Sequence, residues 1–403
     1  MNLLEKLRIN REESYFDASS GTLMDPEVFS AMQEYFKVEY GNPGSMHAKG
    51  LVAAHALNLA RQNVAKILNA DPEEIIFTGS GTESVNLALK GVAQKNKDKG
   101  KHIICTSIEH HAVLDSLEYL QRVHGFKITL IDVEENGIVD VEKIKKAITK
   151  DTLLISVMYA NNEVGTIQPL KEISKLTKKN GIFLHTDACQ AANSESLDVE
   201  ELGVDLMTLN ASKIYGPKGV GCLYKRKGIE MEPLIHGGGQ EYNLRSGTEN
   251  IPLIVGFSKA LAIAHKNKKD YCKKLTELRD HLISELLKID NTILNGDPKK
   301  RLPNNVNITF LNVEGESVLL KLDEKGICAS SGSACASRSL DPSHVITGLG
   351  MPKEAAHGSI RFTLSKHTTK KGVDKVIEVL PRIIQELRDI SPVDMTVEDI
   401  KNA

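Results

Sequence analysis

The chain has 403 residues, of which 41% are hydrophobic, enough apolar material for a sizeable core divided between two domains. A formal net charge of -2 gives no field that would attract nucleic acid or an acidic membrane, so a small molecule or a protein is the expected partner. No segment has transmembrane length, the N-terminus lacks the features of a targeting peptide, and the six cysteines form no CxxC pair. We therefore expect a cytoplasmic protein without a disulfide framework or structural zinc.

Short apolar runs alternate with helical segments over the first two thirds of the chain. Strands are predicted at 73–79, 101–107, 127–133, 152–160, 181–187 and 205–210, with helices at 84–95 and 170–179 among them. This alternation predicts a mostly parallel sheet with helices on both faces. After 256–270 the pattern changes to a long charged helix, a strand at 304–313 and a final strand and helix. The sequence therefore predicts a large α/β domain over 15–260 and a smaller α+β domain formed by 1–14 and 261–403.

Three polar signals stand at the ends of predicted strands, where open α/β sheets bind ligands. Gly81 and Thr82 lie in a turn of small residues that opens a helix, which suits a phosphate but also an ordinary capped helix. Asp187 ends an apolar strand, where its carboxylate can pair with a protonated ring nitrogen or simply face water. Lys213 follows another strand, and a desolvated amine there would attack an aldehyde, whereas most lysines are surface charges. In this order the three signals match the phosphate, ring nitrogen and aldehyde of pyridoxal phosphate.

Cys335 stands in SSGSACASRS, a run of residues too small to pack well. Such a run predicts a loop, over about residues 328–342, and a thiol placed to react. Cys328 ends a more apolar stretch and is predicted to belong to the core. Cys189, two residues after Asp187, is interpreted as a packing residue and not as a second sulfur carrier.

The chain resembles the cysteine desulfurases of the NifS/IscS type, which belong to the aminotransferase-like class of pyridoxal-phosphate enzymes. The resemblance runs from YFDASSGTLMDP to ELRDISP through YGNPGSMH, FTGSGTES, IEHHAVL, ANNEVGTIQP, HTDACQ, KIYGPKGVG, HGGGQE, LRSGTEN, EGES, SSGSACAS and SIRFTLS. It implies the type I aminotransferase fold, a large mostly parallel sheet domain with a smaller α+β domain. It also implies a homodimer that binds pyridoxal 5'-phosphate and converts L-cysteine to L-alanine, with the sulfur held as a persulfide on Cys335.

The same resemblance implies that the sulfur passes to an iron–sulfur scaffold protein, and that Cys335 transiently ligates a cluster shared with that scaffold. Arg361 of SIRFTLS resembles the residue that grips the substrate carboxylate, although a structural ion pair is the alternative. A selenocysteine lyase or an aminotransferase would share the cofactor site, but an aminotransferase has no use for a loop thiol. A non-catalytic docking subunit of a sulfur-transfer complex is the third alternative.

Roles around the cofactor ring are also carried over by resemblance. Lys213 forms the Schiff base, Asp187 pairs with the pyridine nitrogen, and His110 stacks on the ring face. Asn162 and Gln190 resemble the side chains that hydrogen-bond the ring's phenolic oxygen, with Asn162 also near the substrate carboxylate. Without the resemblance, His110 would be interpreted as a buried histidine at a strand end, and the two amides as turn or surface residues.

The phosphate end of the predicted site departs from the family pattern. Gly81 and Thr82 are expected to hold the phosphate, and Thr248 resembles the residue that reaches it from the other subunit. The family usually has an imidazole just before its lysine, whereas this chain has Asn210 and Ser212 around that position. Both residues can donate hydrogen bonds to the phosphate, but one donor that can carry charge is missing.

Overall fold

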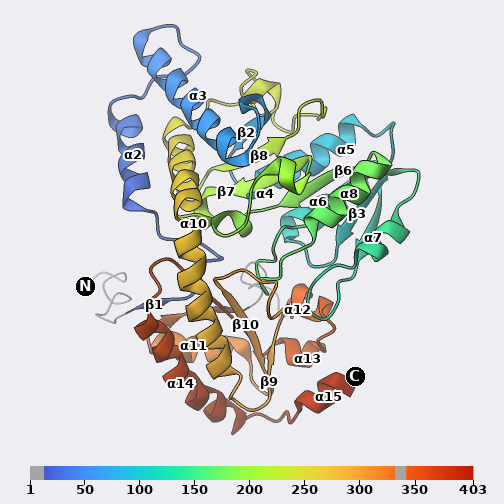
Figure 1. The fold of residues 1–403 in the computed structure, drawn as a ribbon, viewed down its shortest axis with the longest axis vertical. Coiled ribbons are helices and arrows are strands. Elements are labelled where there is room, and N and C mark those ends of the chain that lie inside the picture. Colours follow the sequence, from blue (N-terminus) through green and yellow to red (C-terminus); the bar gives the residue numbers. More distant parts are fainter. Residues whose placement is uncertain (1–12, 332–341, 403) are drawn as a thin grey trace.

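The predicted strands form most of one seven-stranded sheet in the computed structural model, which describes residues 13–331 and 342–402 (Figure 1). They are β2 (Ile75–Thr78), β3 (His102–Thr106), β4 (Lys127–Ile131), β5 (Thr152–Ser156), β6 (Phe183–Asp187) and β7 (Leu206–Asn210). The strand order is β2-β8-β7-β6-β5-β3-β4, and the neighbours from β7 to β4 pair in parallel. The seventh strand, β8 (Gly221–Lys225), was missed by the sequence analysis and runs antiparallel to β2 and β7. The predicted mostly parallel sheet is confirmed.

Both faces of this sheet are covered, so its inner strands are buried and rich in apolar residues, whereas the edge strand β4 is partly exposed. Successive side chains of β3 point to opposite faces of the sheet. Ile104 packs in one hydrophobic cluster and Ile103 in another. The first cluster includes residues of α2 (Pro26–Lys37), α3 (Ala48–Leu68), α7 (Val141–Ala147) and α8 (Leu170–Asn180). The second includes residues of α4 (Gly81–Asn86), α5 (Val92–Lys95) and α6 (His111–His124), with a π-helical turn, Leu87–Gly91, between α4 and α5. The predicted helix at 84–95 therefore contains a change of helical type.

A second unit surrounds a four-stranded antiparallel sheet with the order β12-β13-β10-β9. These strands are β9 (Thr292–Leu294), β10 (Asn305–Phe310), β12 (Ser330–Ser331) and β13 (Ser359–Thr363). The helices of this part are α11 (Gly315–Glu324), α12 (His344–Gly348), α13 (Lys353–Ala356), α14 (Lys370–Arg388) and α15 (Val397–Asn402). The short strand β1 (Ser14–Tyr15) pairs in parallel with β11 (Ile327–Cys328), so the first described residues lie beside the C-terminal third of the chain.

One long helix, α10 (Ile251–Leu286), connects the two units and contacts elements of both (Figure 1). The predicted domain boundary at residue 260 falls inside this unbroken helix and stays a prediction. Among the described helices, none combines the length and apolarity that a bilayer crossing requires.

A buried carboxyl group lies just beyond β3, one residue before His110. Glu109 is fully buried, and its Oε1 accepts hydrogen bonds from the hydroxyl of Thr106 and, at 2.8 Å, from the backbone N–H of Met158. Its Oε2 has no hydrogen-bond partner among the described residues. The pKa of Glu109 is raised to about 8, chiefly by burial and in smaller part by the nearby carboxylate of Asp187. Glu109 is therefore protonated at neutral pH.

This raised pKa predicts a stability that depends on pH. The folded protein favours protonated Glu109, so the contribution is complete below the ordinary pKa of 4.5 and is lost as the pH rises through about 8. Glu109→Gln has no carboxyl group there and lacks this loss. The free energy of unfolding of the variant, relative to that of the wild type, should therefore rise by up to about 1.4 kcal/mol for each pH unit across that range. Urea denaturation at a series of pH values measures the difference. Glu118→Gln, on the exposed side of α6, is the control, and a difference for Glu109→Gln that does not change with pH would contradict the argument.

Candidate functional site

A cavity of about 550 Å³ lies at the carboxyl edge of the large sheet, beside Arg361 of β13. The predicted site residues that line it are Gly81, Thr82, His110, Asn162, Asp187, Gln190, Asn210, Lys213 and Arg361. They come from segments up to 280 positions apart in the sequence and meet because parallel strands bring their carboxyl ends to one edge. Ser212 and Thr248 do not line this cavity, and Thr248 is exposed. Cys335 lies outside the described residues.

Lys213 ends a short 3-10 helix, Ala211–Lys213, that follows β7 directly. Its Nζ donates a hydrogen bond of 2.8 Å to the backbone carbonyl of Ser20, and its own carbonyl accepts one of 2.7 Å from Asn193 Nδ2. The side chain is half-buried and faces the same cavity as Asp187 at the end of β6. Asp187 accepts a hydrogen bond of 3.0 Å from the backbone N–H of Cys189. An amine and a carboxylate therefore lie at neighbouring strand ends of one cavity.

The turn from β2 into α4 forms a narrow cradle. Ser80 caps α4 by accepting a hydrogen bond of 3.1 Å from the N–H of Glu83, and the first amides of the helix have no acceptor within it. A Cβ added at Gly81 would lie 3.0 Å from Cys189 Sγ, and one at Gly221 would lie 2.5 Å from the carbonyl of Ser80. Glycine is thus required for this close approach, and the resulting helix start suits an anion.

Asn210 faces this cradle, and Ser212 holds its orientation. Asn210 Oδ1 accepts hydrogen bonds from the N–H of Ser212 at 3.1 Å and from its hydroxyl at 3.2 Å. An amide oxygen only accepts, so Nδ2 is turned away from Ser212, and it would lie 3.5 Å from a Cβ at Gly81. Asn210 therefore offers a neutral donor to this cradle, while Ser212 stands at the position where the family pattern has an imidazole. A direct contact between Ser212 and the phosphate stays a prediction. In this structure the hydroxyl of Ser212 donates its hydrogen bond to Asn210.

His110 is the N-cap of α6, and its Nδ1 accepts a hydrogen bond of 3.0 Å from the N–H of Ala112. In the neutral imidazole the proton is then on Nε2. Two further histidines, His111 and His344, line the cavity with ring centroids 4.8 Å apart and were missed by the sequence analysis. His344 Nε2 donates a hydrogen bond of 2.9 Å to the carbonyl of Glu109, which ties α12 to the segment before α6.

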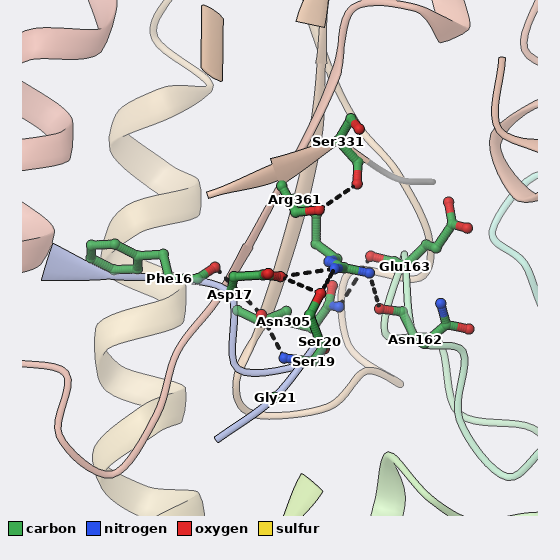
Figure 2. A network of polar contacts seen from close by, with 12 residues as sticks. Phe16, Asp17, Ser19, Ser20, Gly21, Asn162, Glu163, Asn305, Ser331 and Arg361 are labelled. Carbon is green, nitrogen blue, oxygen red and sulfur yellow. Dashed lines mark hydrogen bonds and ion pairs between the residues drawn. The ribbon is translucent and has the colours of Figure 1, made fainter. Parts of the chain in front are cut away.

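Arg361 is enclosed by acceptors from two distant segments, as Figure 2 shows. Its side chain is 3% exposed, and Nη2 donates to Asp17 Oδ1 at 2.9 Å and to Ser20 Oγ at 3.0 Å. Nη1 donates to the carbonyl of Asn162 at 3.2 Å, while Nε has no hydrogen-bond partner among the described residues. The sequence analysis did not identify Asp17 or Ser20 as site residues, although both stand in the motif YFDASSGTLMDP.

Glu163 is a second cavity residue that sequence reasoning missed. Its side chain is buried, and the hydroxyl of Ser343, the N-cap of α12, donates to its Oε2 at 2.5 Å. Burial raises the pKa of Glu163 to about 7, while the charge of Arg361 lowers it. The carboxyl group thus holds the start of α12 against the large sheet. Its position beside Asn162 in the motif ANNEVGTIQP was the only signal in the sequence.

The thiols near the cavity are held protonated. Burial, reinforced by the negative charge of Asp187, raises the pKa of Cys189 well above its ordinary value. Burial raises the pKa of Cys328 to about 11, although Cys328 is only half-buried in β11 and does not line the cavity. A protonated thiol is a poor nucleophile, and this supports the interpretation of Cys189 as a packing residue.

The residues present fit pyridoxal phosphate. The cradle of Gly81 with the donor of Asn210 suits the phosphate, the carboxylate of Asp187 suits a protonated ring nitrogen, and Lys213 supplies an amine in the same cavity. A cavity of about 550 Å³ also has room for a small amino acid beside such a cofactor. The donors of the cavity therefore suit this group, although Thr248 does not line the phosphate end and the imidazole of the family pattern is missing there.

Comparisons with known proteins agree with this geometry. The family aminotransferase class-V matches residues 14–376. The protein "Cysteine desulfurase IscS" of Methanosarcina thermophila is 50% identical over 388 residues, which cover 96% of each chain. A solved structure described as a NifS-like protein has a TM-score of 0.87 at 38% identity, covering 93% of this chain and 100% of its own. Another, described as SspA in complex with cysteine, has a TM-score of 0.78 at 33% identity, covering 88% of this chain and 100% of its own. With its fold and nearly its whole length matched, this chain belongs to the class-V aminotransferases and, among them, to the cysteine desulfurases of the NifS/IscS type.

Proposed function

We propose that the protein is a pyridoxal-phosphate-dependent cysteine desulfurase that converts L-cysteine to L-alanine and keeps the sulfur as a persulfide on Cys335. One observation carries the proposal: a single cavity holds the amine of Lys213, the carboxylate of Asp187 and the guanidinium of Arg361. These groups are complementary to an aldehyde, a protonated pyridine and an amino-acid carboxylate. The membership of the desulfurase family supports the same reading.

When bound, pyridoxal phosphate supplies an aldehyde that bonds to amines and a ring that withdraws electrons. Lys213 is the amine for that bond, and Asp187 keeps the ring nitrogen protonated. His110 would stack on the ring face, oriented by the hydrogen bond that its Nδ1 accepts from the N–H of Ala112, which in the neutral imidazole leaves the proton on Nε2. Gly81, Thr82 and Asn210 bind the phosphate, while Thr248 of a second subunit completes that end in a homodimer.

Substrate recognition falls to residues on the other side of the cavity. Arg361 binds the carboxylate of L-cysteine through its planar array of N–H donors, and Asn162 lies beside it, its carbonyl already bonded to Nη1. Gln190 would hydrogen-bond the phenolic oxygen of the ring through its side-chain amide, whose Nε2 donates a hydrogen bond of 3.1 Å to the carbonyl of Ser19. The amino acid is thus oriented with its side chain open to an incoming thiolate.

The sulfur transfer balances as an exchange between L-cysteine and Cys335. The Cys335 thiolate attacks the substrate sulfur, an S–S bond forms, and the C–S bond breaks. The electron pair of that bond stays on carbon, which takes up a proton to give the methyl group of alanine. The persulfide then passes to an iron–sulfur scaffold protein in the cytoplasm, with Cys335 as a transient ligand of a shared cluster, as the resemblance implies.

Replacing Cys335 by alanine tests the sulfur carrier. We expect a protein that still binds the cofactor, with its visible absorbance unchanged, but that releases no alanine from L-cysteine and carries no persulfide by mass spectrometry. Cys189→Ala is the matched control and should keep both activities, because its thiol is held protonated. Undiminished alanine release by Cys335→Ala would refute the assignment.

Lys213→Ala separates an enzyme from a docking subunit. The variant should lose the absorbance of a cofactor bound covalently to the protein. A wild type that stays colourless after addition of pyridoxal phosphate would contradict the proposed function and would favour docking.

Asn210→Ala tests the neutral phosphate donor. Loss of one hydrogen bond to a charged group should weaken pyridoxal phosphate about tenfold or more, since such bonds contribute about 1.5–3 kcal/mol. Pyridoxal, which has no phosphate, should bind both proteins equally, and fluorescence titration of the apoprotein measures both ligands. Equal weakening of the two ligands would show that Asn210 acts on the fold and not on the phosphate.

A further inference from the structure

The strongest unexplained feature of the cavity is that the donors of Arg361 are already engaged. A guanidinium has five N–H groups, and the three that form hydrogen bonds here point to Asp17, Ser20 and the carbonyl of Asn162. The Nε–H group has no partner among the described residues, but its nitrogen is buried and is not open to the cavity. One N–H of Nη1 is therefore the donor left for an incoming carboxylate. Arginine suits carboxylates because it can donate two parallel hydrogen bonds to them. Such a two-point contact at Arg361 requires that one of its present hydrogen bonds breaks.

Asp17 is the acceptor with the greatest effect on a second carboxylate. Its Oδ1 lies 2.9 Å from Nη2, and the Arg361 side chain is 3% exposed while that of Asp17 is 21% exposed. A charge pair this poorly solvated is screened little, so a substrate carboxylate on the same guanidinium is repelled by Asp17. In the absence of substrate the same carboxylate compensates a buried positive charge, which would otherwise be costly.

Ser20 acts between the two charges. Its hydroxyl donates to Asp17 Oδ1 at 2.8 Å and accepts from Arg361 Nη2 at 3.0 Å, so it withdraws part of the Asp17 charge from the guanidinium (Figure 2). Its backbone carbonyl separately accepts the hydrogen bond of Lys213. The turn at 17–21 thus contacts both the amine and the guanidinium of the site.

We propose that Asp17 and Ser20 are positioning residues that set the affinity of Arg361 for the substrate carboxylate. The carboxylate of Asp17 competes with the substrate for Arg361, and the hydroxyl of Ser20 weakens that competition by its hydrogen bond to Asp17. The inference rests on the proposed function, because it takes Arg361 as the carboxylate ligand. The two residues then have opposite effects: removal of the Asp17 charge strengthens binding of the amino acid, and removal of the Ser20 hydroxyl weakens it. A merely structural role would weaken binding in both cases.

The test compares two ligands of the cofactor-loaded protein that differ by one carboxylate, L-alanine and ethylamine, through the change in cofactor absorbance on titration. Asp17→Asn should lower the Kd of L-alanine about fivefold or more, since a like charge near the bound carboxylate is removed. Ser20→Ala should raise that Kd about threefold, since Asp17 loses a hydrogen-bond donor and pairs more strongly with Arg361. The double variant should behave like Asp17→Asn, because the Ser20 effect requires the Asp17 charge. Ethylamine should bind all of these proteins alike.

Asp98→Asn is the matched control, since it removes an exposed carboxylate that does not line the cavity and should change neither Kd. The proposal is overturned if Asp17→Asn leaves the Kd of L-alanine unchanged or raises it, if the two ligands shift together, or if Ser20→Ala does not raise the Kd of L-alanine. Should Asp17→Asn fail to fold, Asp17→Ser replaces it, because it also removes the carboxylate and should lower the Kd of L-alanine in the same way. Absence of alanine release from L-cysteine by the wild type would instead contradict the proposed function, and the ligand comparison would still report on Asp17.

Discussion

A buried guanidinium must have its charge and its donors satisfied, and this requirement organises the junction between the two units of the structure. Arg361 lies on a strand of the small sheet, yet its partners come from the turn after β1 and from the loop after β5. Loss of any partner would leave part of a poorly solvated charge unpaired, which is among the costlier defects in a protein. The three segments are therefore fixed relative to one another by the group that we propose binds the substrate.

The large sheet contributes the complementary half of the site through its strand ends. Asp187 ends β6 and Asn210 ends β7, and Lys213 follows within one short turn, so parallel pairing of the strands places the residues that we propose bind the cofactor. The antiparallel strand β8 adds to this, because Gly221 at its start lets the backbone of the β2–α4 turn approach closely. The pairing of these strands therefore determines both the sheet and the positions of the residues in the cavity.

The sequence was informative where local pattern decides structure. The six predicted strands are real because each is a short apolar run bounded by turn residues, a pattern that a sheet covered on both faces demands. The strand β8 was missed because its five residues follow a glycine-rich turn and carry no comparable run. The π-helical turn after α4 has no local signature in SVNLALKGVAQK either.

Site residues were predictable only where a strand end or a family motif marked them. Of the partners of Arg361, Asn162 was predicted from its motif but Asp17 and Ser20 were not, because the contact between Asp17 and Arg361 spans 344 positions and belongs to tertiary packing. The same holds for Glu163, whose hydroxyl donor Ser343 stands 180 positions away, and for His344 on α12. Residue type suggested nothing for these groups, since an aspartate or a glutamate in a turn is most often solvated.

The electrostatics of the cavity also explain why the sulfur acceptor has to come from elsewhere in the chain. Asp187 is proposed to keep a ring nitrogen protonated, and the same negative charge, together with burial, raises the pKa of the cavity's own thiol, Cys189. A cavity that favours cations at this position therefore disfavours a thiolate. The nucleophile must be ionised under other surroundings and brought to the substrate, and the run of small residues around Cys335 is the segment of the sequence suited to that task.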